Sequence, residues 1–261
     1  MSPALRQVEQ NDRRVLAAVR FVDPVTGRGV EQGLTVRPVG DGRWFPNRSG
    51  LWVLRAEGVL DDHAHAFEAP PGGTVAGSVA VTAEVFDATG AFAPRRFAVA
   101  VPREGDDLLT PVDVLLVPAP SMPLRASWAA VRVSVAWETD GGHPVPIGVE
   151  GALVRLEAAE LGGLRCAALT DARGEALVVA HGIPRLLPGT DADTVVRGTV
   201  EHELHVVVER SATDFDTGRR DALADPDDLW ARRGVLATED PAPFDLSVGG
   251  LHAVTVPIPR P

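Results

Sequence analysis

The amino-acid sequence predicts an all-β protein built from two β-sandwiches in tandem. One strand–turn–strand pattern occurs twice, with its two copies about 120 residues apart. The composition combines 26 glycines and 22 prolines with only 5% aromatic residues, which is typical of many short strands joined by tight turns. At 261 residues the chain is also near the length at which one core stops growing, so two domains are expected.

The repeat pairs three segments of each half, and each segment contains a strand or a turn between strands. In the first copy the segments are 19–30, 33–38 and 47–54; in the second they are 133–145, 151–156 and 171–178. Self-similarity at the length of a domain indicates two related sandwiches. The repeated residues are those of a scaffold, so the differences between the copies are where function is expected.

In the first half, residues 1–14 are expected to form a polar arm that precedes a sandwich domain over 15–118. Apolar residues recur with period two over 79–85, which predicts a half-buried strand. The run Asp23-Pro-Val-Thr-Gly predicts a turn, because proline presets φ and Gly27 accepts positive φ. Strands are expected from Val15 and at 34–39, 51–55, 78–86, 96–101 and 112–117.

Residues 119–127 are the expected linker, since two prolines there oppose both a helix and a central strand. The second sandwich domain is expected over 128–261. Asp171 and Gly174 predict a hairpin, because the aspartate can bond nearby backbone and the glycine accepts a left-handed conformation. Strands are expected at 131–137, 152–158, 164–170, 176–180, 195–199, 204–210 and 253–258.

The stretch 211–250 is expected to be irregular except for one short helix. Asp225 is placed to cap that helix, Pro226 stands at its first position and Gly234 ends it.

Charge and composition exclude several classes of partner. The formal net charge is −11 and every one of the 25 basic residues is arginine, so we expect no nucleic-acid partner. No apolar run is long enough to span a bilayer, and the start of the sequence lacks the apolar core of a signal peptide. We therefore expect a cytoplasmic protein without signal peptide or membrane insertion, released on lysis if it belongs to a particle. Cys166 is the only cysteine, which excludes an intramolecular disulfide.

Two histidine clusters are candidates for a metal site. His63 and His65 would share one face of a strand, in a run with acidic neighbours that resembles a cupin motif, and the alternative is a solvated loop. His202 and His205 lie three apart, so on a strand they face opposite sides, and the alternative is a charged sheet edge. We expect no metal or other cofactor, with a metal-dependent cupin-like enzyme as the third interpretation.

Support for nucleophilic catalysis is weak. Cys166 lies in an apolar strand, where a buried and inert thiol is expected, and no Gly-x-Ser-x-Gly elbow or phosphate-binding glycine loop occurs. We therefore expect a protein that is not an enzyme. Trp44 and Trp52 would form a sugar-binding platform if exposed, which gives the alternative of an adhesin-like or carbohydrate-binding module; the other interpretation places them in a core.

The second half resembles the carboxypeptidase regulatory-like domains of transthyretin-like fold. The resemblance rests on the strand in 145–156, the Thr-Asp-Ala-Arg-Gly hairpin at 170–174 and the Gly-Ile-Pro that begins at Gly182. It implies two tandem immunoglobulin-like or transthyretin-like sandwiches. Intradiol dioxygenases of this general fold bind iron through tyrosines, and this sequence has none. Hydroxyisourate hydrolases end in Tyr-Arg-Gly-Ser, which differs from the end of this chain.

The first half resembles the N-terminal part of two-domain proteins from contractile, phage-tail-like injection systems, on residues 20–28 and 46–54. That resemblance implies a structural or assembly protein, an accessory component of the cap, baseplate or surface. Its partners would be other protein subunits, and self-association is a further mode. We expect strand edges, the arm and segment 211–250 to make the contacts. The interface residues expected there are Trp230 and Phe244 as apolar anchors, with Arg232 and Arg233 as charged partners. The alternative, above all for Trp230, is that they cover their own sandwich.

Overall fold

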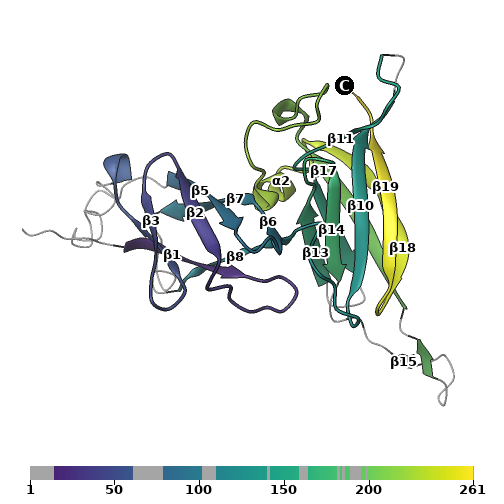
Figure 1. The fold of residues 1–261 in the computed structure, drawn as a ribbon, viewed down its shortest axis with the longest axis horizontal. Coiled ribbons are helices and arrows are strands. Elements are labelled where there is room, and N and C mark those ends of the chain that lie inside the picture. The colour runs from purple at the N-terminus through teal and green to yellow at the C-terminus, as the bar shows by residue number, and fades with distance from the viewer. Residues whose placement is uncertain are drawn as a thin grey trace, which may run out of the picture.

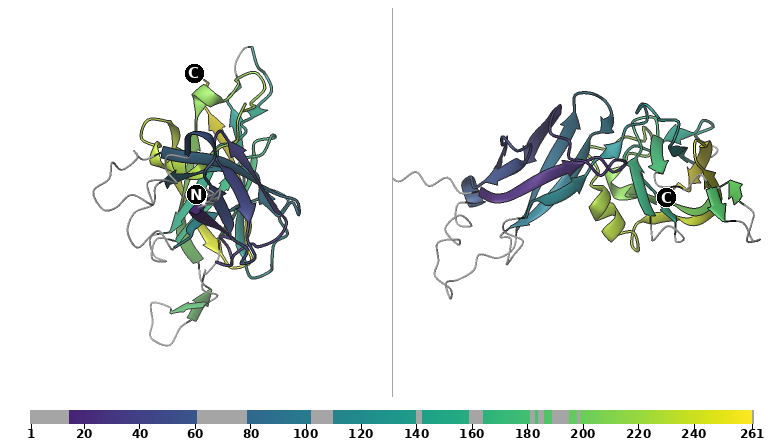
Figure 2. Two further views of the ribbon diagram at one scale, coloured as in Figure 1. Left: turned by 90° about the vertical axis from the view of Figure 1, so that its left-hand side faces the viewer. Right: turned by 90° about the horizontal axis from the view of Figure 1, so that it is seen from below.

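The computed structural model describes residues 15–60, 79–101, 110–139, 142–158, 164–180, 183, 186–188, 195–197 and 199–260. These residues form β-strands in several sheets, with one short α-helix near the C-terminus, so the prediction of an all-β fold is confirmed. Figure 1 shows two β-rich units arranged side by side, and Figure 2 shows the same pair from two further directions.

The first unit packs one four-stranded sheet, of order β3-β4-β1-β8, against a three-stranded sheet of order β2-β5-β7. Phe21, Trp44 and Phe97 pack edge to face in its core. A short pair, β6 and β9, lies beside the second unit. The strands are β1 (Val15–Val22), β2 (Leu34–Val39), β3 (Arg43–Pro46), β4 (Trp52–Arg55), β5 (Val79–Asp87), β6 (Phe92–Ala93), β7 (Arg95–Val101), β8 (Val112–Leu115) and β9 (Val117–Pro118), with a 3-10 turn η1 at Gly58–Leu60.

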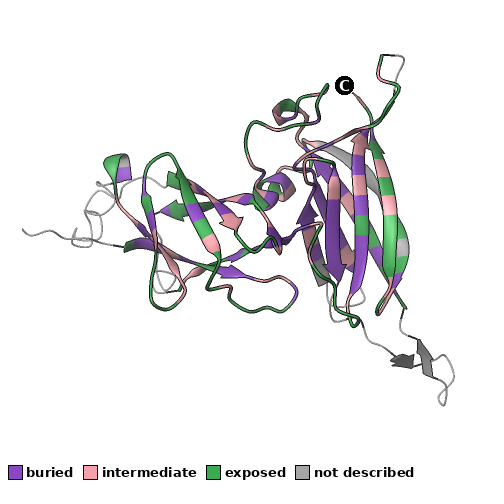
Figure 3. Cartoon of the chain, viewed as in Figure 1, coloured by how far each residue is buried: buried purple, intermediate pink, exposed green. Residues whose placement is uncertain are grey.

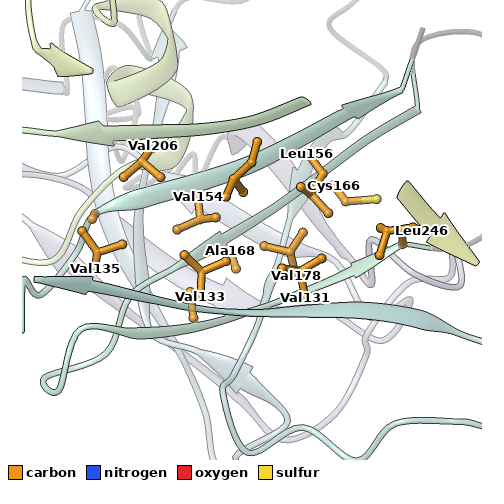
Figure 4. Close-up of a cluster of buried hydrophobic side chains, with 14 of the residues drawn as sticks. Val131, Val133, Val135, Val154, Leu156, Cys166, Ala168, Val178, Val206 and Leu246 are labelled. Carbon is orange, nitrogen blue, oxygen red and sulfur yellow. The ribbon is translucent and has the colours of Figure 1, made fainter. Parts of the chain in front are cut away.

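The second unit packs a sheet of order β13-β12-β17-β18 against a sheet in which β10 pairs with β11, β14 and β19. Alternate residues of the strands point inward, and Figure 4 shows their valine, leucine and alanine side chains meeting between the sheets. The elements are β10 (Ala129–Trp137), β11 (Ile147–Gly148), β12 (Leu153–Ala158), β13 (Leu164–Leu169), β14 (Glu175–Ala180), β15 (Leu186–Pro188), β16 (Val195–Arg197), β17 (Thr199–Val208), η4 (Arg210–Ala212), α2 (Pro226–Ala231), β18 (Ala237–Ser247) and β19 (Leu251–Ile258).

The two units share their strand topology. In each, the first strand pairs antiparallel with one neighbour and parallel with the last strand of the same sheet: β1 lies between β4 and β8, and β10 lies between β14 and β19. The units differ at the third strand, because β3 pairs with β4 whereas β13 pairs with β12. The three segments of the sequence repeat thus occupy equivalent positions in the two units.

The repeated hairpin has the same hydrogen bonds in both copies. The side chain of Asn47 accepts from the backbone N–H groups of Ser49 and Leu51, at 2.9 Å each. The side chain of Asp171 accepts from the equivalent N–H groups, at 2.8 and 3.0 Å. Gly50 and Gly174 have φ of 73° and 77°, which glycine adopts at little cost. A side-chain acceptor and a glycine therefore build the same turn twice.

The expectation that 211–250 is irregular apart from its helix is wrong for residues 237–247, which form β18. This strand contains Pro241 and Pro243, and neither can donate a backbone hydrogen bond. Two prolines are compatible with this strand because β18 lies at the end of its sheet, where a proline N can face away from the neighbouring strand. The predicted strand at 195–199 is also split: β16 pairs with β15, and Thr199 begins β17.

Apolar side chains from both units meet at the junction. Val117 of β9 joins a buried cluster with Leu153, Leu169, Val207 and Leu229 of the second unit. A second cluster places Val25 of the first unit against Ala130, Leu177 and Val179. The predicted linker, 119–127, lies beside these clusters, and its first residue is buried. Figure 3 shows the buried residues continuing through the junction, so the two units are packed against each other.

Candidate protein-interaction surfaces

Helix α2 stands between the two units and contacts β7 of the first and β12, β13 and β17 of the second. Its start follows the expected pattern: the Asp225 carboxylate accepts from the Asp227 N–H at 3.0 Å, and Pro226 occupies the first turn. Leu229 is buried in the junction cluster. The helix therefore presents Leu229 to the junction, and the partly buried Trp230 packs against the same cluster.

Arg95 ties the start of α2 to the first unit. Its side chain is 1% exposed, and Nη2 lies 3.1 Å from Asp225 and 2.6 Å from Asp227. Nη1 donates to the carbonyl of Leu115 at 2.5 Å. Burial raises the pKa of Asp225, while the nearby Arg95 charge opposes that rise. A charged hydrogen-bond network around the buried Arg95 thus joins the units in addition to their apolar contact.

Trp230 packs on the outer face of its own unit. The Arg155 guanidinium lies 3.8 Å from the centre of its ring, the Arg233 guanidinium 4.3 Å, and the His205 ring makes an edge contact at 5.6 Å. Arg155 and His205 are neighbours on β12 and β17. Because Trp230 is only partly exposed and has cation–π partners, it covers this sheet and leaves one part of its surface accessible.

Arg232 is engaged within the chain. It lies 2.8 Å from Glu209 and 2.5 Å from Asp228, and Glu209 also accepts from Arg220 at 2.8 Å. Burial raises the pKa of Glu209, but the hydrogen bonds from the two arginines outweigh burial and lower it overall. Arg233, the other predicted charged partner, is exposed. Its side chain donates a hydrogen bond to the backbone carbonyl of Trp230.

The structure does not bring all four predicted interface residues together. Trp230, Arg232 and Arg233 belong to α2 and the turn that follows it, whereas Phe244 lies on β18, where its backbone pairs with His202. Edge strands were the other expected contact elements. Several strands end a sheet in the described part of the chain, among them β18 and β19, and of these two β19 is the one without an internal proline before Pro257, close to its end.

Strand β19 has a free edge whose register can be derived from two bonds. The N–H of Ala130 donates to the carbonyl of Gly250, and the N–H of Glu138 donates to that of Ile258, both at 2.9 Å. In a parallel ladder alternate residues bond the same neighbour. The even-numbered residues of β19 therefore bond β10, and the odd-numbered ones point their backbone groups away from it. No strand in the described part of the chain pairs with that side.

Only the first part of the open edge of β19 carries outward N–H donors. Leu251, Ala253 and Thr255 present N–H donors, and Leu251 is 58% exposed. Pro257 lacks a donor at the next outward position, which ends the stretch that an added strand could use. A cavity of about 330 Å³ adjoins this end and is lined in part by Trp137, Thr255 and Pro257. A short edge beside a side-chain pocket is the arrangement that β-strand addition requires.

The equivalent edge of the first unit is partly occupied. The N–H of Leu116 donates to Val22 at 2.9 Å, so the outward positions of β8 are the odd-numbered ones. The outward carbonyl of Leu115 accepts from Arg95. The two units thus share a topology, but the outward edge of β8 is partly occupied by Arg95, whereas that of β19 is open.

Neither histidine cluster forms a metal site in the described part of the chain. His63 and His65 lie outside the described residues. His202 and His205 face opposite sides of β17, as expected, but β17 is an inner strand of its sheet, so the interpretation as a sheet edge is wrong. Burial lowers the pKa of His202. Across the described ranges, no group of three or more potential ligands is arranged for a metal ion.

The tryptophan platform is also corrected. Trp44 is 6% exposed and belongs to the core of the first unit, where it contacts Phe97 at 5.5 Å, and Trp52 is partly buried against the same core. A buried indole ring cannot stack on a sugar from solvent. Cys166 is buried in the second core, as expected.

No family model, curated protein or solved structure matches this chain. Among the described residues, no helix is long and apolar enough to span a membrane. The evidence on function is therefore the geometry of the surfaces.

Sequence reasoning missed two features of these surfaces. One is Arg95, whose partners lie 130 and 132 residues away in sequence. The other is a second turn of the kind found at Asp23: Asp214 accepts from the Thr217 N–H and hydroxyl, and Gly218 has φ of 69°. The signal for this turn was present, since Asp-x-x-Thr-Gly-Arg occurs at both places.

Proposed function

We propose that this chain is a non-enzymatic structural protein, an accessory component of the cap, baseplate or surface of a contractile phage-tail-like injection particle. The kind of particle comes from the resemblance of the first half. The open edge of β19 is the structural observation that carries the proposal, because it offers a way to add a strand from another subunit.

The junction supports the same proposal. A component that transmits position or load needs units of fixed relative orientation, and here the Arg95 network and two apolar clusters link the units. Inter-domain contacts of this kind limit relative motion when they are apolar and extensive. The chain then presents β19 at a fixed place with respect to the first unit.

The test is performed in the strain that produces the chain. Particles are purified after deletion of its gene and after complementation with wild type, Ala253→Pro or Ala253→Ser. Proline at 253 removes an outward donor while leaving the bonds to β10, and serine is the matched control that keeps the donor. We expect the wild type and Ala253→Ser to copurify with particles and restore normal contraction, and Ala253→Pro to be lost from them.

Unchanged particle composition, morphology and contraction on deletion would overturn the assignment to the particle. Retention of Ala253→Pro at the wild-type level would instead reject β19 as the contact while leaving the assignment in place.

A further inference from the structure

A cleft between the two units offers a second contact site. Its volume is about 670 Å³, within the range of pockets that bury a bound ligand. It lies between the end of β5 with its following turn, the connection after β9, the hairpin between β13 and β14, and the stretch 220–224 before α2. Both units supply walls, so the cleft depends on the junction described above.

The walls of the cleft are mostly apolar. Phe92 and Leu169 are 9% and 3% exposed, and the partly buried Phe86, Pro120 and Leu223 complete this surface. Such a surface favours an occupant with aliphatic or small apolar groups, because their burial removes apolar area from water.

The charges around the cleft are unbalanced. Five carboxylates and one guanidinium line the cleft. The acids are Glu84, Asp87, Glu150, Asp171 and Asp221, and the base is Arg220. Arg220 is 7% exposed and lies 2.8 Å from Glu209, so its charge is matched outside the cleft. Glu84 is matched in turn by Arg96 at 3.0 Å. Glu150 lies 3.7 Å from Arg219, and Asp171 lies 3.3 Å from Arg173. Asp87 and Asp221 form no ion pair within the described part of the chain, and they leave the cleft negative.

Two of these acids are held in place by the turns they cap. Burial raises the pKa of Asp87, but the bonds from Thr89, Phe92 and Ala91 outweigh it and lower that pKa overall. Asp171 accepts two backbone N–H bonds and lies 3.3 Å from Arg173. Their positions are fixed by the same turns, so the cleft carries preorganised negative charge.

From these walls and charges we propose that the cleft binds an extended peptide segment of a partner protein, with an arginine or lysine flanked by small apolar residues. This inference rests on the proposed function, because it names the chemistry of the partner. The basic side chain would lie near the exposed Asp221, and its apolar neighbours against Phe92 and Leu169. Charge complementarity selects this occupant over an acidic or neutral segment.

The test uses the full chain and fluorescein-labelled heptapeptide pools. One pool has arginine or lysine at the centre and alanine, valine, leucine or proline elsewhere; the comparison pool has glutamate at the centre. Fluorescence polarisation is measured for wild type, Asp221→Arg, Ala222→Trp and Asp216→Arg. Asp221 and Ala222 are exposed residues of the cleft, and Asp216 is an exposed acid outside it, which provides a matched charge reversal.

We expect the basic pool to bind the wild type and the acidic pool not to bind. Asp221→Arg should weaken binding by about tenfold or more, through like-charge repulsion, and Ala222→Trp should weaken it by filling the cleft. Asp216→Arg should bind as the wild type does. Absence of binding, equal binding of both pools, or equal binding by all variants would overturn the proposal.

Arginine amide alone provides a further arm. If it binds as tightly as the basic pool, the occupant is a small cation and the peptide proposal is wrong. The particle test remains separate: loss of peptide binding with normal copurification rejects the cleft alone, and peptide binding without particle association rejects the particle assignment alone.

Discussion

Single glycines allow the closest backbone packing of the second unit. A Cβ added to Gly148 would lie 2.1 Å from the Arg173 carbonyl oxygen, and one added to Gly218 would lie 1.8 Å from the oxygen of Gly148. Backbone atoms cannot rotate away as a side chain can. Gly148 on β11 is therefore held between the Asp171 hairpin and the Asp214 turn, which fixes both turns against one strand.

Replacement of Gly148 by alanine tests this packing. We expect Gly148→Ala to lower the free energy of unfolding by about 1–3 kcal/mol, the usual cost of forcing extra atoms into a packed region. Gly234→Ala is the control, because Gly234 has no heavy atom within 4 Å of the added Cβ and no positive φ. Denaturant unfolding measures both. Equal midpoints for the two variants would show that the region around Gly148 can relax.

Glu209 makes a residue-scale contribution that depends on pH. Its pKa in the folded protein is below its ordinary value of 4.5, because the bonds from Arg220 and Arg232 outweigh burial. A lowered pKa means that the ionised form adds stability above the pKa of the unfolded chain, and that this stability is lost as the pH falls through the folded value.

We therefore expect Glu209→Gln to be less stable than the wild type at pH 7, by about 1–3 kcal/mol, and the difference to shrink below about pH 4.5. Unfolding by denaturant at pH 7, 5, 4 and 3 gives the comparison. Glu201→Gln, at an exposed position of β17, is the control and should differ little from the wild type throughout. A difference that stays constant with pH would contradict the role given to the Glu209 carboxylate.

At the scale of elements, the fold could be predicted from the sequence wherever local pattern decides it. Period two over 79–85 predicted β5, and the Asp225 cap with Pro226 predicted α2. Strand β18 could not be predicted in this way, because the prolines at 241 and 243 oppose a strand unless its place at a sheet edge is known.

The surfaces could be predicted only in part. Trp230 was identified as an anchor from its position in the sequence, but its packing on Arg155 and His205 depends on strands β12 and β17, far away along the chain. The cleft and the Arg95 network required the relative placement of two units. Tertiary placement leaves little trace in a single sequence, whereas turns and caps are encoded by neighbouring residues.

The register of β19 makes a prediction about stability that is independent of any partner. Ala253 points its N–H away from β10, and Val254 points its N–H toward it. We expect Ala253→Pro to unfold at nearly the same denaturant concentration as the wild type, as the native Pro257 occupies an equivalent position. Val254→Pro should be destabilised by about 3 kcal/mol or more, since it removes a ladder bond and introduces a clash. If Ala253→Pro were the more destabilised variant, the odd-numbered residues of β19 would be the ones that bond β10, and the assigned register would be wrong.

At the scale of the whole molecule, one buried arginine decides how firmly the units are joined. Replacing Arg95 with leucine would leave the Asp225 carboxylate, 13% exposed, without its cationic partner, and would free the Leu115 carbonyl. Loss of one member of a buried pair costs about 3–5 kcal/mol. The pKa of Asp225 is already raised by burial, so removal of the Arg95 charge would raise it further.

We expect Arg95→Leu to separate unfolding of the two units into distinct transitions and to increase the radius of gyration measured by small-angle X-ray scattering, because the apolar clusters alone would not hold the junction closed. Arg20→Leu is the matched control: its ion pair with Asp113 is 2.6 Å long but exposed, so its loss should change stability little and leave the radius unchanged. A single transition and an unchanged radius in Arg95→Leu would mean that the apolar clusters suffice. The cleft, which needs both units in place, should lose its basic peptide in Arg95→Leu only if the junction opens.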